Sequence, residues 1–182
     1  MRYFIGVHIR GEAAEYYKAT CADLAARFGV TNVAEIVPPY MTVRAPFERN
    51  SIDDIDNLIS LVNAETPALP MTLSGWNHFG NKTIFIDVPA PSAELKAFAE
   101  SFLGKLRGLG LPDQPQEKGL HFHMSVARFL KGNDFELIWK FLQSLPAPKF
   151  EIMFDNLTIF VKEGRDDKAW KILKTFPLTG KK

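Results

Sequence analysis

The sequence predicts an α+β fold made of two pseudo-symmetric β-α-β-α lobes, with antiparallel sheets flanking a central cleft. Two observations carry this prediction. Segments with strand and helix patterns alternate along the chain, and the same strand-helix order recurs in its second half. The length of 182 residues suits one domain, here residues 1–182, whose two small lobes share a core.

The first unit begins with a strand over residues 3–9, which are rich in β-branched and aromatic types. Residues 12–28 place apolar side chains at helical spacing and are followed by Gly29, a typical helix C-cap. A short strand over residues 40–44 and a second helix over residues 51–63 complete the unit.

The second unit repeats the first. Phe4-Ile5-Gly6-Val7 is echoed by Phe85-Ile86-Asp87-Val88, 81 positions later. Tyr40-Met41-Thr42-Val43 is echoed by His123-Met124-Ser125-Val126, 83 positions later. The apolar stripes of the intervening helices match at the same offsets. We therefore predict an internal duplication with units at about residues 1–65 and 82–146.

Further strands fill the rest of the chain, at about residues 68–77 and 148–178. Residues 69–76 precede a turn at Gly80-Asn81 and residues 83–88 follow it, which predicts a hairpin. A long apolar segment over residues 149–161 has Asp155-Asn156 in its middle, where a turn or bulge is expected.

Composition narrows the class of protein. The formal net charge of +1 gives no general attraction to nucleic acid, so any RNA contact must be local. The single cysteine, Cys21, excludes an intrachain disulfide and a cysteine metal cluster. The N-terminal segment lacks signal-peptide anatomy, and no apolar run approaches the ~18 residues of a membrane span. We expect a cytoplasmic protein without a membrane partner.

The candidate chemistry lies on the two repeated short strands. Residues i and i+2 of a strand share a face, so Tyr40 and Thr42 point one way, as do His123 and Ser125. If the repeats pack about a pseudo-twofold axis, both polar faces line one cleft. That cleft would hold an aromatic acid/base group and a hydroxyl from each half.

Such a set suits phosphoryl transfer. One side chain takes the proton from the attacking oxygen, and the other gives a proton to the leaving oxygen. The two hydroxyls donate hydrogen bonds to the non-bridging oxygens, where charge accumulates. The scheme needs neither a metal nor a cofactor, and the sequence shows no metal-binding cluster.

Paired motifs of the form His-x-Thr/Ser-x resemble those of the two-histidine (2H) phosphoesterases, which include 2′-5′ RNA ligase-like proteins. The proline run before the first motif, the Arg-Ala-Pro-Phe after it and the opening Met-Arg-Tyr-Phe-Ile resemble that family too. The resemblance implies metal-independent hydrolysis or ligation at 2′,3′-cyclic or 2′-5′ phosphodiester linkages of RNA ends or nucleotides. By position, His123 and Ser125 match the second motif, Thr42 matches the hydroxyl of the first, and Tyr40 replaces its histidine.

The tyrosine changes the expected chemistry. A free histidine titrates near ~6.5 and a tyrosine near ~10, so Tyr40 is a proton donor but a poor base at neutral pH. We expect His123 to act as general base and Tyr40 as general acid or hydrogen-bond donor to the phosphate. Three interpretations stay open: a weakened or redirected phosphodiesterase, a nucleotide- or RNA-end-binding protein without turnover, and another use of the scaffold.

Three further residues are candidates for substrate binding. Arg44 shares the strand parity of Thr42 and could neutralise a phosphate, or be a surface cation. His121 could contact substrate at the cleft mouth, be a solvated strand-end histidine, or form a metal pair with His123. Phe79 could stack on a base or pack in a turn. Arg128 differs from His123 by five positions and is expected to face away.

Overall fold

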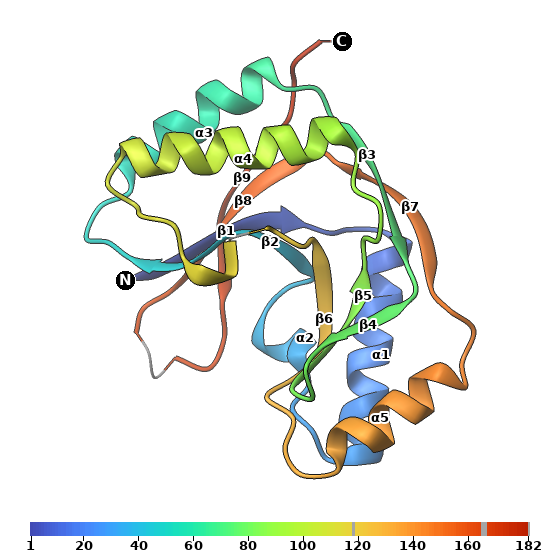
Figure 1. The fold of residues 1–182 in the computed structure, drawn as a ribbon. Helices are drawn as coiled ribbons and strands as arrows, with labels where there is room; N and C mark the ends of the chain where they lie inside the picture. Colours follow the sequence, from blue (N-terminus) through green and yellow to red (C-terminus); the bar gives the residue numbers. More distant parts are fainter. Residues whose placement is uncertain (118, 165–166, 182) are drawn as a thin grey trace.

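A computed structural model describes residues 1–117, 119–164 and 167–181, which form three antiparallel sheets and five α-helices (Figure 1). The α+β class with antiparallel sheets is confirmed. The order β-α-β-α occurs in both halves, as β1-α1-β2-α3 and as β5-α4-β6-α5, with the short α2 (Val33–Ile36) added after α1.

The first sheet has the strand order β2-β1-β8-β9. Its strands are β1 (Arg2–His8), β2 (Tyr40–Glu48), β8 (Asn156–Lys162) and β9 (Lys171–Pro177). The central strand β1 is buried on both faces, and Gly6 lies within it. A Cβ at Gly6 would collide with the carbonyl oxygen of Met41, so the β1–β2 pairing requires glycine at this position.

The second sheet has the order β4-β5-β6, with β4 (Trp76–Phe79), β5 (Thr83–Asp87) and β6 (His123–Arg128). A separate two-stranded sheet pairs β3 (Leu69–Ser74) with β7 (Lys149–Phe154). The predicted hairpin is therefore only partly right, because β4 alone pairs with β5.

Gly75 is the physical reason for that difference. It has a left-handed φ of 77°, which ends β3 and lets β4 start in a new direction. Its N–H donates to the carbonyl of Pro148, and its own carbonyl accepts from the N–H of Asp87. A similar change occurs at Asp155, where the chain leaves β7 and enters β8 of the first sheet. The turn expected at Asp155-Asn156 is thus the point where the chain changes sheets.

The helices exchange partners between the two halves. Their bounds are α1 (Glu12–Phe28), α3 (Asp53–Glu65), α4 (Ala93–Gly108) and α5 (Asp134–Gln143). Helix α1 of the first half contacts β6 of the second sheet, beside α5. Helix α4 of the second half lies beside α3, which contacts β8 and β9 (Figure 1). One hydrophobic core consequently runs through both halves. No helix among the described residues is both long and apolar enough to cross a membrane.

Candidate active site

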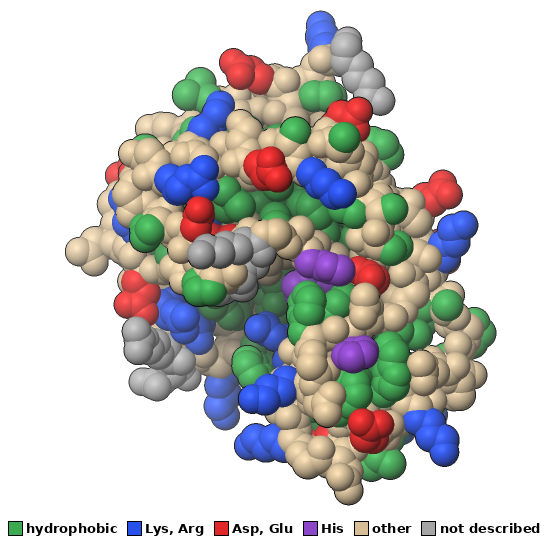
Figure 2. All heavy atoms as spheres, viewed as in Figure 1, with side chains coloured by type: hydrophobic (Ala, Val, Ile, Leu, Met, Phe, Trp, Pro, Cys, Tyr) green, Lys and Arg blue, Asp and Glu red, His purple; other side chains and the backbone are tan. Residues whose placement is uncertain are grey.

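The repeated motifs of β2 and β6 meet at one pocket of about 440 Å³. Five of the residues singled out from the sequence line it: Thr42, Phe79, His121, His123 and Ser125. Arg128 lines it as well. Figure 2 shows histidine side chains at the rim of a hollow with a largely hydrophobic floor.

The apolar face of each motif anchors these strands. Met41 and Val43 of β2 and Met124 and Val126 of β6 are all fully buried. Their burial is what the alternating pattern of the strands predicts. Because these four side chains fix both strands in the core, Thr42 and Ser125 are held toward the pocket.

His123 is oriented by its own strand. Its Nδ1 lies 2.7 Å from the carbonyl oxygen of His121, so Nδ1 carries the proton and donates it. Nε2 is therefore the unprotonated nitrogen of the neutral ring. Burial is the main cause that lowers the pKa of His123, and it outweighs the backbone hydrogen bond, which raises the pKa. The nearby His121 and Arg128 lower it to a lesser extent, and Asp87 raises it. The site thus holds a neutral imidazole, the form that accepts a proton.

Two phenylalanines provide the burial. The ring centroids of Phe79 and Phe85 lie 4.9 and 4.8 Å from that of His123, and 5.6 and 5.5 Å from that of His121. Phe85 is fully buried, whereas Phe79 is 44% exposed and lines the pocket. Phe79 is therefore a wall of the pocket and also covers one side of the His123 ring.

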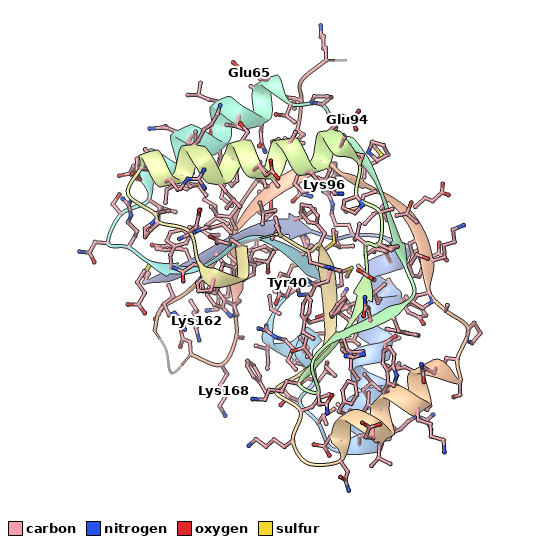
Figure 3. The ribbon with its side chains drawn as sticks, in the orientation of Figure 1. Tyr40, Glu65, Glu94, Lys96, Lys162 and Lys168 are labelled. Carbon is pink, nitrogen blue, oxygen red and sulfur yellow. The ribbon has the colours of Figure 1, made fainter. Side chains whose placement is uncertain are left out.

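Tyr40 lies beside this pocket without lining it (Figure 3). Its ring packs 5.0 Å from Phe4 and 5.9 Å from Phe160, and its hydroxyl accepts a hydrogen bond from Nη1 of Arg128 at 3.0 Å. Burial raises the pKa of Tyr40, against a smaller opposite effect of Arg128. Tyr40 is a neutral phenol here and shares a second, neighbouring pocket with Thr42 and Arg128.

Arg128 faces the pocket, contrary to the parity expected from the sequence. Phe85 pairs with Ser125, whereas Ile84, the residue before Phe85 in β5, pairs with Ala127. Val126 is therefore an extra residue, and this β-bulge returns Arg128 to the face of Ser125. We found no signal for the bulge in the sequence, because Val126 and Ala127 suit a regular strand equally well.

A second bulge removes Arg44 from the shared face. Gly6 pairs with Thr42 while Ile5 pairs with Arg44, so Val43 is an extra residue of β2. Arg44 is 1% exposed and forms an ion pair with Glu117 at 2.6 Å. It lies outside the pocket that Thr42 lines.

Glu117 also accepts from the N–H of Ala45 at 2.8 Å, so it joins the segment over residues 109–117 to β2. Its ion pair with Arg44 holds one wall of the pocket, to which Glu117 itself contributes.

His121 is held by a buried carboxylate. Its Nε2 lies 2.5 Å from Oδ1 of Asp87, whose Oδ2 accepts a hydrogen bond from the Asn77 amide at 2.9 Å. The sequence did not single out Asp87, which lies in the apolar strand β5. His78, in contrast, packs against Phe135 and Trp139, outside the pocket. The described residues contain no group of three or more His, Cys, Asp or Glu side chains placed to hold a metal ion.

Paired strand motifs that bring a histidine and two hydroxyls to one pocket of an α+β fold resemble the paired motifs of the 2H phosphoesterases. A family model described as the 2′-5′ RNA ligase superfamily matches residues 13–166. The chain therefore belongs to that superfamily. No curated protein matches the sequence.

Solved structures share the fold over nearly the whole chain. TT0787 of Thermus thermophilus superposes with a TM-score of 0.65 at 15% identity, covering 100% of both chains. E. coli LigT complexed with 3′-AMP gives 0.62 at 15% identity, covering 98% of this chain and 97% of LigT. A structure described as a phosphoesterase gives 0.63 at 17% identity, covering 98% of both.

Proposed function

We propose that the protein is a 2H-type phosphoesterase that acts on 2′,3′-cyclic or 2′-5′ phosphodiester linkages of RNA ends or nucleotides. The observation that carries the proposal is the pocket in which His123, held as a neutral base, meets Thr42, Ser125 and Arg128. LigT, which shares the fold, has been crystallised with 3′-AMP, with ATP and with NADP+. These ligands are nucleotides with phosphates, the chemical class that we propose for this pocket. We place the activity in the cytoplasm, the compartment that the sequence predicts.

In the proposed reaction, Nε2 of His123 takes a proton from the attacking water or hydroxyl, whose oxygen bonds to phosphorus as the P–O bond to the leaving oxygen breaks. The leaving oxygen then takes a proton from the protonated His123 or from solvent water. The hydroxyls of Thr42 and Ser125 donate hydrogen bonds to the non-bridging oxygens as negative charge builds on them. The Arg128 guanidinium, at the wall of the same pocket, balances that charge. The protein thereby supplies a base and three electrostatic contacts from its own side chains, and we propose that turnover needs no metal.

For Tyr40 the geometry favours a role other than direct proton transfer. Its hydroxyl accepts from Arg128 and its ring is packed among Phe4 and Phe160, so it is placed to fix the guanidinium. We propose that Tyr40 is a positioning residue for Arg128. The site then has one acid/base histidine, whereas the paired family motifs supply two. We expect turnover to be ~10²–10⁴-fold lower than in a site with both histidines.

The same observation favours a second candidate function, binding of nucleotides or RNA ends without turnover. A pocket with hydroxyls, an arginine and one neutral histidine holds a phosphate whether or not a proton is delivered to the leaving oxygen.

One experiment separates the two. Purified protein is incubated with the four nucleoside 2′,3′-cyclic phosphates and a 2′-5′ dinucleotide, with a metal chelator present. The enzyme hypothesis expects slow hydrolysis that His123→Ala abolishes and that Tyr40→Phe slows further, because the Tyr40 hydroxyl holds Arg128. His78→Ala is the matched control, because His78 lies outside the pocket.

The binding hypothesis expects no hydrolysis by the wild type, together with calorimetric binding of nucleotides that weakens in His123→Ala and in Thr42→Ala. A protein that neither hydrolyses nor binds any of these compounds would rule out both functions.

A further inference from the structure

A second pocket, of about 310 Å³, adjoins the candidate active site. The two pockets share Thr42, Pro46 and Arg128, so they meet on either side of the Arg128 side chain. The second pocket extends toward the end of β8 and the segment before β9, and the proposed reaction makes no use of it.

Cations gather around this second pocket. Arg2, Arg128, Lys162 and Lys168 line it, and its described lining includes no acidic side chain. Arg2 is paired with Glu48 at 3.6 Å, so the excess of positive charge comes from the other three. Figure 3 shows Lys162 and Lys168 near one another on the Tyr40 side of the molecule, and Figure 2 shows Lys and Arg side chains gathered there. In a chain with a net charge of only +1, this is a local concentration of positive charge that favours a phosphate.

Aromatic side chains are interleaved with the cations. The Trp170 ring meets Phe4 edge-on at 4.8 Å, and its backbone N–H donates to the Ile36 carbonyl at 2.7 Å. Nζ of Lys162 lies 5.4 Å from the centroid of the Trp170 ring. Trp170 is thus a fixed aromatic wall, half-buried and with a cation over its ring.

Phe129 is the least expected of the pocket residues. It is 75% exposed, and its φ of 57° is the one positive value among the described non-glycine residues. A bulky residue in this backbone conformation is strained, and an exposed ring contributes nothing to the core. The guanidinium of Arg128 lies 5.1 Å from its ring centroid, so Phe129 stands at the border of the two pockets.

We propose that the second pocket binds the nucleotide next to the reacting phosphodiester, and that the substrate is a single-stranded RNA end in preference to a mononucleotide. Lys168 and Arg128 contact the backbone phosphate, and the flanking base stacks on Phe129 or Trp170. Cations along a groove with aromatic stacking surfaces are the pattern by which proteins hold single strands. The proposal rests on the proposed function for the position of the reacting phosphate.

The test compares two product-like ligands that cannot turn over, a short 5′-labelled oligoribonucleotide with a 3′-phosphate and the corresponding nucleoside 3′-monophosphate. Wild type is expected to bind the oligoribonucleotide more tightly. Phe129→Gly removes the ring and keeps a residue suited to the left-handed backbone. It should weaken oligoribonucleotide binding about 5- to 150-fold, the range for one stacked base, and leave mononucleotide binding unchanged.

Charge is tested separately. Lys168→Ala should reduce the slope of log K against log salt for the oligoribonucleotide by about 0.7, the value for one phosphate contact on a single strand. Lys140→Ala is the matched control, because Lys140 is an exposed lysine on α5 that lines neither pocket. It should leave the slope unchanged.

Equal affinity of wild type for the two ligands would overturn the proposal, as would unchanged oligoribonucleotide binding in both Phe129→Gly and Lys168→Ala. Failure of the proposed enzymatic function would give a result that differs from failure of the proposed strand-binding pocket. A protein that hydrolyses no phosphodiester but loses oligoribonucleotide affinity in these variants would keep the second pocket as a strand-binding site and refute only the enzymatic function.

Discussion

Nη1 of Arg128 donates a hydrogen bond to the hydroxyl of Tyr40 at 3.0 Å, joining the two motifs across 88 residues of sequence. Tyr40 opens the first motif, and Arg128 follows His123 of the second. The contact therefore links the half of the site in which we propose that a tyrosine replaces the histidine to the half that bears His123.

Tyr40→Phe tests the proposed positioning role. The variant removes the acceptor but keeps the ring that packs on Phe4 and Phe160. A hydrogen bond to a charged group contributes about 1.5–3 kcal/mol, so kcat/KM for a cyclic phosphate should fall about tenfold or more. In urea unfolding, the dependence of the unfolding free energy on urea concentration (the m value) should stay close to that of wild type. Unchanged kcat/KM would argue against positioning of Arg128 by Tyr40.

The pH dependence of the reaction should report His123. Its pKa is lowered by burial, so the neutral base persists at neutral pH and the rate should fall only below the ordinary histidine value of about 6.5. Phe79→Ala lets water reach the ring and should move the acid limb of the pH–rate profile upward. An acid limb that stays in place would mean that Phe79 does not control the proton affinity of His123.

The same shift has a consequence for stability. Because the folded pKa of His123 lies below the unfolded one, the unfolded state binds protons first as the pH falls. The contribution of His123 to stability should therefore be lost as the pH drops from about 6.5 toward the folded value. Urea unfolding of wild type and His123→Gln at several pH values measures this contribution. The free energy of unfolding should fall more steeply with decreasing pH in wild type than in the variant.

Arg44 should matter for folding and not for phosphate binding. Removing one partner of a buried ion pair costs about 3–5 kcal/mol, so Glu117→Gln and Arg44→Met should each lower the free energy of unfolding strongly. The double variant Arg44→Met, Glu117→Leu should recover part of this loss. Calorimetry on the double variant, in which neither charge is left unpaired in the pocket wall, should give a nucleotide affinity close to that of wild type, whereas a large loss of affinity would restore Arg44 as a phosphate ligand.

Asp87→Asn tests whether His121 contacts substrate. The carboxylate orients the imidazole of His121 at 2.5 Å, and the amide would still accept from Asn77. If His121 meets the substrate, KM for an anionic substrate should rise severalfold. The acid limb due to His123 should move to lower pH, because the charge of Asp87 raises the pKa of His123. A kcat and KM both equal to those of wild type would mark His121 as a solvated strand-end histidine.

Periodicity was sufficient to predict the elements and the anchoring of the motifs. Met41, Val43, Met124 and Val126 alternate with polar residues, and all four are fully buried. The recurrence of Tyr40-Met41-Thr42-Val43 as His123-Met124-Ser125-Val126 placed Thr42 and Ser125 on one pocket. These features depend on residues close in sequence, which is why the sequence reveals them.

Features set by pairing between distant strands could not be predicted. The bulges at Val43 and Val126 each reverse the parity of the residues that follow, so Arg44 turns into the core and Arg128 turns to the pocket. A valine at position 43 or 126 is equally compatible with a regular strand, so the sequence gives no sign of the bulges. The partner of Arg44, Glu117, lies 73 positions away in a segment with no regular pattern, and only the folded chain brings the two charges together.

The exchange of helices between the halves limits how this protein can be divided or recombined. Helix α1 is encoded beside the strand that bears Tyr40, yet it packs against the strand that bears His123. A fragment containing only one repeat would leave a sheet without its helix and expose apolar side chains. A chimaera that exchanges the His123 motif with a relative should therefore retain activity only if α1 comes from the same parent as β6.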